Sequence, residues 1–219
     1  MSSGFATFTE EHEAFRSTVR AWVQREIVPH VVAWEEAEAF PRELYSKAAE
    51  QGFFGLKYAE AHGGTNAGVF YEAVLHEELS KCGSGGVAAG LGAQATIATG
   101  PLHLFGNDDL KQRFLAPAIR AEKIGAFAVT EPGGGSDVAG LKTTARREGD
   151  HYVVNGSKTY ITNGVVADYV IVAVKTDPAR GHKGLSMLVV EKGTPGFGVS
   201  KKLKKLGWRA SNTAELFFD

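Results

Sequence analysis

The sequence has one cysteine, no excess of either charge and no long apolar run. Cys82 cannot form a disulfide within the chain or a thiolate metal cluster, which favours a reducing compartment. A formal net charge of −1 over 219 residues leaves no excess of Lys and Arg to neutralise phosphates, which argues against a protein devoted to nucleic acid. No apolar run reaches the length that spans a bilayer, and the start at Met1-Ser2-Ser3-Gly4 resembles neither a signal peptide nor a transit peptide. We therefore predict a protein without a membrane span, cytoplasmic in a bacterium or in the mitochondrial matrix of a eukaryote.

The histidines also lack the spacing of a metal site. His76-Glu77 begins like a zinc-protease helix, but the residue four positions after His76 is Ser80, which cannot supply the second imidazole. Residues 90–95 fit the dinucleotide pattern G-x-G-x-x-A, yet no strand precedes them and no βαβ unit surrounds them. We predict no metal, and we interpret these glycines as small residues for close helix packing.

The first half of the sequence has helical periodicity. After a polar start at Thr9, Phe15, Val19, Trp22 and Ile27 form one apolar stripe that predicts a long helix ending near Pro29. Further helices are predicted from Phe40-Pro41 to Gly52, over 69–81, over 87–105, and after a capping Asn107. Together these segments predict an all-helical domain over residues 1–122.

The second half changes to the alternation and turn pairs of strands. Gly149-Asp150 and Asn155-Gly156 are turn signals, and residues 151–162 are predicted to form a hairpin. Residues 169–174 and 185–190 are predicted buried strands. The pattern indicates an antiparallel β-barrel or sandwich domain over residues 123–219. Because the sequence stops in the apolar run 215–219, we expect this domain to be truncated at its C-terminal end.

Residues 127–137, Phe-Ala-Val-Thr-Glu-Pro-Gly-Gly-Gly-Ser-Asp, carry the strongest functional signal. The buried strand 124–129 stops at Thr130, and three glycines that permit positive φ follow. Converging N–H groups in such a nest, with the Thr130 and Ser136 hydroxyls, suit an anionic or carbonyl-rich ligand; the alternative is a flexible turn between two strands. Residues 160–163 add an aromatic face and a second threonine, so the two segments together could hold a planar heterocycle edge-on.

The sequence resembles the acyl-CoA dehydrogenases in three segments that follow one another in the family order. These are Ala-Val-Thr-Glu-Pro-Gly-Gly-Gly-Ser-Asp-Val-Ala-Gly at 128–140, Asn-Gly-Ser-Lys-Thr-Tyr-Ile-Thr-Asn-Gly at 155–164, and Leu-Gly-Trp-Arg-Ala-Ser-Asn-Thr at 206–213. The resemblance implies a helical N-terminal domain, a middle β domain and a C-terminal four-helix bundle. It also implies FAD as cofactor, oxidation of an acyl-CoA thioester to the trans-2-enoyl-CoA, electron transfer to an electron-transfer flavoprotein, and a homotetramer.

The resemblance further implies roles for individual residues. The flavin ring is expected beside the end of the first strand, the FAD phosphates and ribityl chain beside the glycine loop, and the second face of the ring beside residues 160–162. Ser136 is also expected to touch the pantetheine, and the acyl chain is expected along the helix over 91–97. The implied cofactor-binding residues are Phe127, Val129, Thr130, Gly135, Ser136, Tyr160, Ile161 and Thr162, and the implied substrate-binding residues are Ser136, Leu91, Gln94 and Ala95.

The catalytic base is not predicted among these residues. In the family the catalytic glutamate lies in the C-terminal bundle, which the resemblance places beyond Asp219, and we expect Glu131 to form structural hydrogen bonds. The alternatives are an acyl-CoA oxidase or a nitroalkane oxidase on the same fold, or a non-catalytic piece, which would be either a binding module or one chain of a split enzyme.

Overall fold

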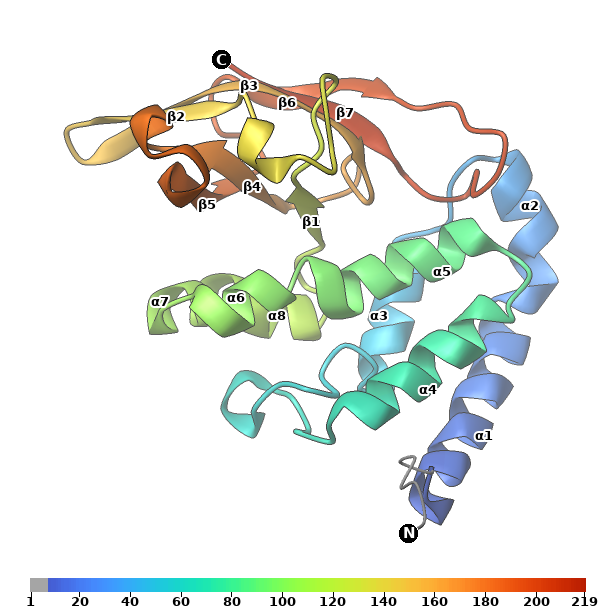
Figure 1. Cartoon of the computed structure of the whole chain (residues 1–219). Coiled ribbons are helices and arrows are strands. Elements are labelled where there is room, and N and C mark those ends of the chain that lie inside the picture. Colours follow the sequence, from blue (N-terminus) through green and yellow to red (C-terminus); the bar gives the residue numbers. More distant parts are fainter. Residues whose placement is uncertain (1–7) are drawn as a thin grey trace, which may run out of the picture.

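The computed structural model describes residues 8–219, in which a group of helices lies against a curled sheet (Figure 1). The helical half runs from α1 to α8, and β1 leads from it into the sheet. The helices are α1 (Glu10–Glu26), α2 (Val31–Glu36), α3 (Glu43–Glu50), α4 (Val69–Ser80), α5 (Gly85–Gly92), α6 (Gly100–Phe105), α7 (Asp108–Leu110) and α8 (Ala116–Ile119). The strands are β1 (Gly125–Ala128), β2 (Thr144–Glu148), β3 (His151–Ile161), β4 (Tyr169–Lys175), β5 (Leu185–Glu191), β6 (Phe197–Lys202) and β7 (Ala214–Phe218). The predicted order of a helical domain followed by a β domain is confirmed.

Helix α1 begins where the sequence predicts. The Thr9 side chain accepts a hydrogen bond from the His12 backbone and the Thr9 N–H donates to His12 Nδ1, which completes a capping box. The predicted apolar stripe is buried at Val19, Trp22 and Val23. The helix ends at Glu26, and a 3-10 turn over Val28–His30 follows it.

The predicted helix over 87–105 is interrupted. After α5, the chain forms a π-helical turn over Ala93–Ile97 before α6 begins at Gly100. The Thr99 hydroxyl donates to the Gln94 and Ala95 carbonyls, both at 3.1 Å, and Pro101 has no N–H to continue a regular ladder. The prediction therefore located a helical segment here but missed the wider turn inside it.

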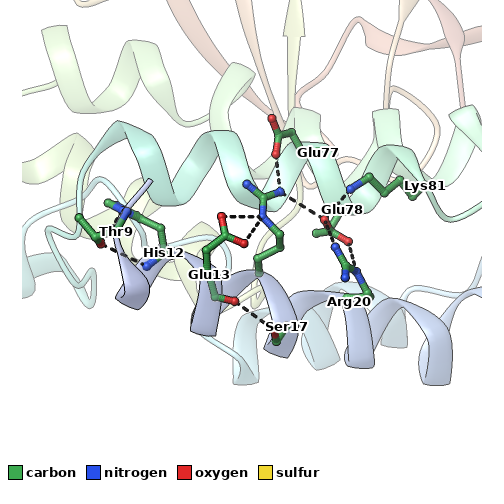
Figure 2. A network of polar contacts seen from close by, with 9 residues as sticks. Thr9, His12, Glu13, Ser17, Arg20, Glu77, Glu78 and Lys81 are labelled. Atoms are coloured by element: carbon green, nitrogen blue, oxygen red, sulfur yellow. Dashed lines mark hydrogen bonds and ion pairs between the residues drawn. The ribbon is translucent and has the colours of Figure 1, made fainter. Parts of the chain in front are cut away.

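A network of charged side chains joins α1 to α4 (Figure 2). Its centre is Glu78, whose side chain is 1% exposed. Arg20 Nε lies 2.9 Å from one Glu78 oxygen, while Lys81 Nζ and Arg16 Nη1 lie 2.6 and 3.3 Å from the other. Hydrogen bonds from Arg20 first, and then from Lys81 and Arg16, outweigh burial and lower the pKa of Glu78 to about 2. The carboxylate therefore stays charged and holds the two helices together.

Replacing Glu78 with glutamine is expected to lower the free energy of unfolding by about 1.5–3 kcal/mol, because hydrogen bonds to a charged acceptor are lost. The folded pKa of Glu78 lies below its ordinary value of 4.5, so its contribution is complete above that pH and falls as the pH drops toward 2. Urea denaturation at pH 7 and pH 3 checks both points. The destabilisation of E78Q relative to the unmodified chain should be smaller at pH 3, and an equal destabilisation at the two pH values would contradict the role of the charge.

The sheet is mixed, which corrects the expectation of an antiparallel domain in one respect. Strand β1 pairs with β4 in parallel from Gly125↔Tyr169 to Ala128↔Val172, and β2 adds one parallel bridge to β4. The other pairings, β2 with β3, β3 with β7, β4 with β5 and β6 with β7, are antiparallel. Parallel pairing requires a long crossover, and the segment between β1 and β4 supplies it. Strand β4 is buried from Tyr169 to Val174, as predicted.

Strand β3 is continuous, so the predicted hairpin turn at Asn155-Gly156 is wrong. The hairpin lies at Gly149-Asp150, where β2 turns into β3. Gly156 instead lies inside β3 with φ of 147°, directly against Thr143. Further along, the β3–β7 register shifts between Lys158 and Ile161, which forms a bulge with Tyr160 in the left-handed region at φ of 60°.

The loop between β6 and β7 returns to the helical half and lies beside α2 (Figure 1). The Arg209 N–H donates to Glu35 at 2.8 Å, and Lys202 Nζ donates to the Glu38 carbonyl at 2.7 Å. Arg42 at the start of α3 pairs with Asp168 just before β4. These contacts couple the two halves of the fold. Among residues 8–219, no helix combines the length and the apolarity needed to cross a membrane.

Candidate functional site

The glycine loop that follows β1 is a tight turn. The Glu131 and Gly134 backbones exchange two hydrogen bonds, of 2.9 and 3.1 Å, which close the turn over Pro132-Gly133. None of Gly133, Gly134 and Gly135 has positive φ. The predicted nest depends on positive φ and is therefore wrong for this loop. The N–H and C=O groups of both Glu131 and Gly134 are also used to close the turn.

A buried ion pair holds this loop against β3. Lys158 is 0% exposed, and its Nζ donates to Glu131 Oε1 at 2.9 Å and to the Val129 carbonyl at 3.0 Å. Glu131 also accepts from the backbone N–H groups of Lys142 and Thr143, at 2.7 and 2.9 Å. Burial raises the pKa of Glu131, but these hydrogen bonds outweigh it and bring the pKa to about 2. The structural role predicted for Glu131 agrees with these contacts, and Lys158 is its partner.

Polar groups remain available at the outer side of the loop. Within the described part of the chain, the N–H groups of Gly135 and Ser136 and the hydroxyl of Thr130 have no hydrogen-bond partner. Gly135 packs against Thr130, because a Cβ added at Gly135 would lie 3.2 Å from Thr130 Cγ2. The predicted Thr130, Gly135 and Ser136 therefore form one cluster of free donors at the end of β1.

The bulge in β3 brings the second predicted segment to this cluster. The Thr159 N–H donates to the Thr130 carbonyl at 2.9 Å, so residues next to Tyr160 contact the start of the loop. The Tyr160 side chain is 69% exposed despite its size, and Thr162 is half-buried. Ile161 is buried in the core of the β domain. Of the three residues, Tyr160 and Thr162 are the ones whose side chains a ligand can reach.

Phe127 and Val129 lie at the end of β1. Both are half-buried, and Phe127 packs against the cluster that contains Phe114 and Tyr169. Val129 offers its carbonyl to Lys158. These two apolar residues therefore lie directly before the glycine loop.

The residues predicted to line an acyl chain lie in the helical half. Leu91 and Ala95 belong to its buried core, and their contact with a substrate remains a prediction. The Gln94 amide donates to the Ala118 and Lys123 carbonyls, both at 2.9 Å, and accepts from the Gly125 N–H at 2.8 Å. Gln94 therefore has a structural role, because these bonds tie the π-helical turn after α5 to the start of β1, and its contact with a substrate also remains a prediction.

Two buried polar residues were missed from the sequence. The hairpin predicted over 151–162 assigns Lys158 no buried role, although a lysine between Ser157 and Thr159, two residues before Tyr160, is a usable signal. Asn163 lies in the turn after β3, where its side chain is fully buried and bonded to the helical half. Both residues support the segments that carry the free donors and the exposed tyrosine.

An apolar cleft of about 520 Å³ lies elsewhere in the β domain. It is lined by the start of β3, by residues 188–190 of β5, and by residues 194–197, which lead into β6. None of the predicted site residues lines it. No group of three or more His, Cys, Asp and Glu residues within 8–219 has an arrangement that could hold a metal ion.

Comparisons with known proteins agree with the fold. The family model described as Acyl-CoA dehydrogenase, N-terminal domain matches residues 9–122, and the model described as Acyl-CoA dehydrogenase, middle domain matches residues 126–219. The short-chain-specific acyl-CoA dehydrogenase of Clostridium acetobutylicum is 41% identical over 212 residues, covering 96% of this chain and 55% of that protein. The long-chain-specific mitochondrial enzyme of Sus scrofa is 39% identical over 216 residues, covering 97% and 49%.

The fold comparison gives the same result. The crystal structure of acyl-CoA dehydrogenase from Geobacillus kaustophilus superposes with a TM-score of 0.93 at 44% identity, covering 98% of this chain and 56% of that one. The chain spans about half the length of the curated relatives it matches. Two family models in the family order, with relatives this similar, establish that the chain belongs to the acyl-CoA dehydrogenase family.

Proposed function

We propose that this chain supplies the flavin-binding and part of the acyl-CoA-binding surface of an FAD-dependent acyl-CoA dehydrogenase, which converts an acyl-CoA thioester to the trans-2-enoyl-CoA. The observation that carries the proposal is the cluster of free donors at Thr130, Gly135 and Ser136, held beside the exposed Tyr160. This arrangement unites the two segments in which the family resemblance is strongest.

The donors present fit a flavin. The edge of an isoalloxazine ring carries carbonyl oxygens and nitrogens that accept hydrogen bonds, and its faces are apolar. Thr130 offers a hydroxyl, Gly135 and Ser136 offer N–H groups, and Tyr160 offers an aromatic side chain that is 69% exposed. A large exposed aromatic residue in a left-handed conformation is unusual unless a function requires it, which supports a ligand at this bulge.

When bound, FAD supplies the hydride acceptor of the reaction. Thr130, with Phe127 and Val129 beneath it, would orient the ring, while Gly135 and Ser136 would bind the part of the cofactor that follows it. Tyr160 and Thr162 would cover the other face, with Ile161 anchoring their strand in the core. No residue of this chain is assigned as the base that removes the α-proton, because Glu131 is bound to Lys158 and to two backbone N–H groups.

Relatives support the cofactor and the partners. A structure of glutaryl-CoA dehydrogenase from Mycobacterium smegmatis is described as a complex with FADH2; it is 30% identical, has a TM-score of 0.90, and the match covers 97% of this chain and 53% of that one. A structure described as the electron transferring flavoprotein of Acidaminococcus fermentans matches with a TM-score of 0.93 at 36% identity. On these grounds we propose FAD as cofactor, an acyl-CoA as substrate and an electron-transfer flavoprotein as electron acceptor. The family resemblance of the sequence is the basis on which we propose a homotetramer for the complete enzyme.

An oxidase is the second candidate. The prolyl acyl carrier protein oxidase AnaB has the same fold, with a TM-score of 0.91 at 31% identity. Hydrogen peroxide formed in equal amount to the enoyl product would favour the oxidase, whereas electron transfer to a flavoprotein without peroxide would favour the dehydrogenase.

Replacing Thr130 with alanine is expected to weaken FAD binding about threefold to tenfold, which corresponds to the loss of one hydrogen bond of about 0.5–1.5 kcal/mol. Titration of the purified chain with FAD, followed by flavin fluorescence and visible absorption, measures the dissociation constant. Thr144→Ala removes an exposed hydroxyl at the start of β2 and serves as the control. Equal affinity of T130A and the unmodified chain would contradict the assignment of Thr130, and absence of FAD binding to the unmodified chain would contradict the proposed cofactor site in this chain.

A further inference from the structure

A buried chain of hydrogen bonds connects the helical half to the bulge in β3. The Tyr45 hydroxyl on α3 donates to Asn163 Oδ1 at 2.8 Å, and Asn163 Nδ2 donates to the Gly90 carbonyl on α5 at 3.0 Å. Asn163 is 0% exposed and Tyr45 is 1% exposed. Two helices of one half are therefore bonded to a single side chain of the other half.

The surrounding backbone leaves little freedom at this point. The Asn163 carbonyl accepts from the Val166 and Ala167 N–H groups, at 3.0 and 2.9 Å, which folds the segment after β3 into a compact turn. Asn163 has φ of 64°, a conformation that asparagine tolerates better than most residues. A Cβ at Gly90 would lie 2.7 Å from the Phe40 ring and 3.2 Å from the Tyr45 oxygen, so close contact here requires glycine.

Asn163 lies three positions after Tyr160 and directly after Thr162 in the same segment. The backbone between them has no regular β7 pairing at the bulge, because the register is shifted from Lys158 to Ile161. Its position is fixed from the loop side by the bond from Thr159 to Thr130, and from the helical side by Asn163. Two anchors on either side of Tyr160 thus determine how this residue is presented.

We propose that Asn163, held by Tyr45 and Gly90, is a positioning residue for the flavin site: it sets the backbone of residues 160–162 relative to α5. The inference rests on the proposed function. The orientation of Tyr160 and Thr162 then depends on α3 and α5. The helical half therefore positions part of the flavin site in addition to covering the sheet.

Tyr45→Phe tests the inference, with Tyr58→Phe as a matched control. Each variant loses one buried tyrosine hydroxyl in the helical half; the hydroxyl of Tyr58 bonds to Thr99 and to the Ala95 carbonyl, and not to the β domain. Hydrogen exchange followed by mass spectrometry measures opening of residues 159–164 without cofactor, and an FAD titration measures the dissociation constant. We expect Y45F to raise exchange in 159–164 at least threefold and the FAD dissociation constant about threefold to tenfold. We expect Y58F to change neither the exchange in 159–164 nor the FAD dissociation constant. Its urea midpoint should fall by about as much as that of Y45F.

Asn163→Gly keeps the positive φ and removes both side-chain bonds, so it should have at least the effect of Y45F, and adding Y45F to it should change exchange no further. Equal exchange in Y45F and Y58F would overturn the inference, even if FAD binds as proposed. If FAD does not bind to the unmodified chain, the selective rise in exchange still supports the coupling, while the proposed cofactor site fails. The two failures are thereby distinguished.

Discussion

Replacing Lys158 with methionine is expected to lower the free energy of unfolding by about 3–5 kcal/mol. The methionine fills most of the volume, but Glu131 then remains buried at 8% exposure without its counter-ion, and the Val129 carbonyl loses its donor. Urea denaturation followed by circular dichroism measures the loss. Because the pair also holds the turn at Glu131-Gly134, we expect K158M to abolish FAD binding under conditions where the chain is still folded.

Glu131, the ion-pair partner of Lys158, supplies the control for this prediction. Glu131→Gln in the K158M background removes the unpaired charge while keeping a similar shape, so the double variant should recover part of the lost stability, as expected for residues in direct contact. Lys142→Met replaces an exposed lysine just before β2. It should change the free energy of unfolding by no more than about 0.5 kcal/mol, as ordinary surface substitutions do. Additive effects of K158M and E131Q would show that the buried pair does not act as one unit.

The sequence was sufficient for most of the elements and for the order of the two domains, whereas the location of the site stays a prediction. The apolar stripe of α1, its polar start at Thr9, the cap at Asn107 and the buried strand β4 are local patterns, and each was found within a few residues of its predicted position. The proposed site rests on two short segments whose composition is unusual, a triple glycine after a strand and a tyrosine among hydroxyl residues. Patterns formed by neighbouring residues can be recognised in the sequence before the fold is known.

What could not be predicted depends on residues that are distant in the sequence. Gln94 is a polar residue in a helical segment of small residues, which suggests a ligand contact. In the structure its amide forms hydrogen bonds to three backbone groups, and their positions depend on the fold. Glycines 133–135 suggested a nest, but the turn closes through Glu131, whose position is fixed by Lys158 from another strand. The parallel pairing of β1 with β4 likewise depends on a crossover that no local period reveals.

Gly156 lies in a sequence typical of a turn, yet it has a different role in the structure. Asn-Gly between alternating residues is typical of a two-residue hairpin turn, because the glycine adopts positive φ. Positive φ is present, at 147°, but inside a continuous strand where β3 passes close to Thr143. The glycine is therefore required by close approach of two backbones as well as by conformation.

Replacing Gly156 with alanine is accordingly expected to cost about 2–4 kcal/mol, the sum of backbone strain and overpacking. The added Cβ would lie 2.5 Å from Thr143 Oγ1 and 2.8 Å from Thr143 Cα, and Thr143 cannot move without pulling on the Glu131 carboxylate that its N–H binds. Urea denaturation and an FAD titration of the same samples are the measurements. We expect a weakened cofactor site as well as lower stability, because the displacement is transmitted through Glu131 to the loop that carries Thr130.

Two further glycines separate the causes. Gly149 has φ of 64° with no atom within 4 Å of an added Cβ, so Gly149→Ala measures backbone strain alone and should cost about 1 kcal/mol. Gly133 has neither positive φ nor a close neighbour, so Gly133→Ala should be neutral or slightly stabilising. If Gly149→Ala were as costly as Gly156→Ala, conformation alone would explain Gly156. If Gly156→Ala costs more and also weakens FAD binding, the contact with Thr143 connects the middle of β3 to the flavin site.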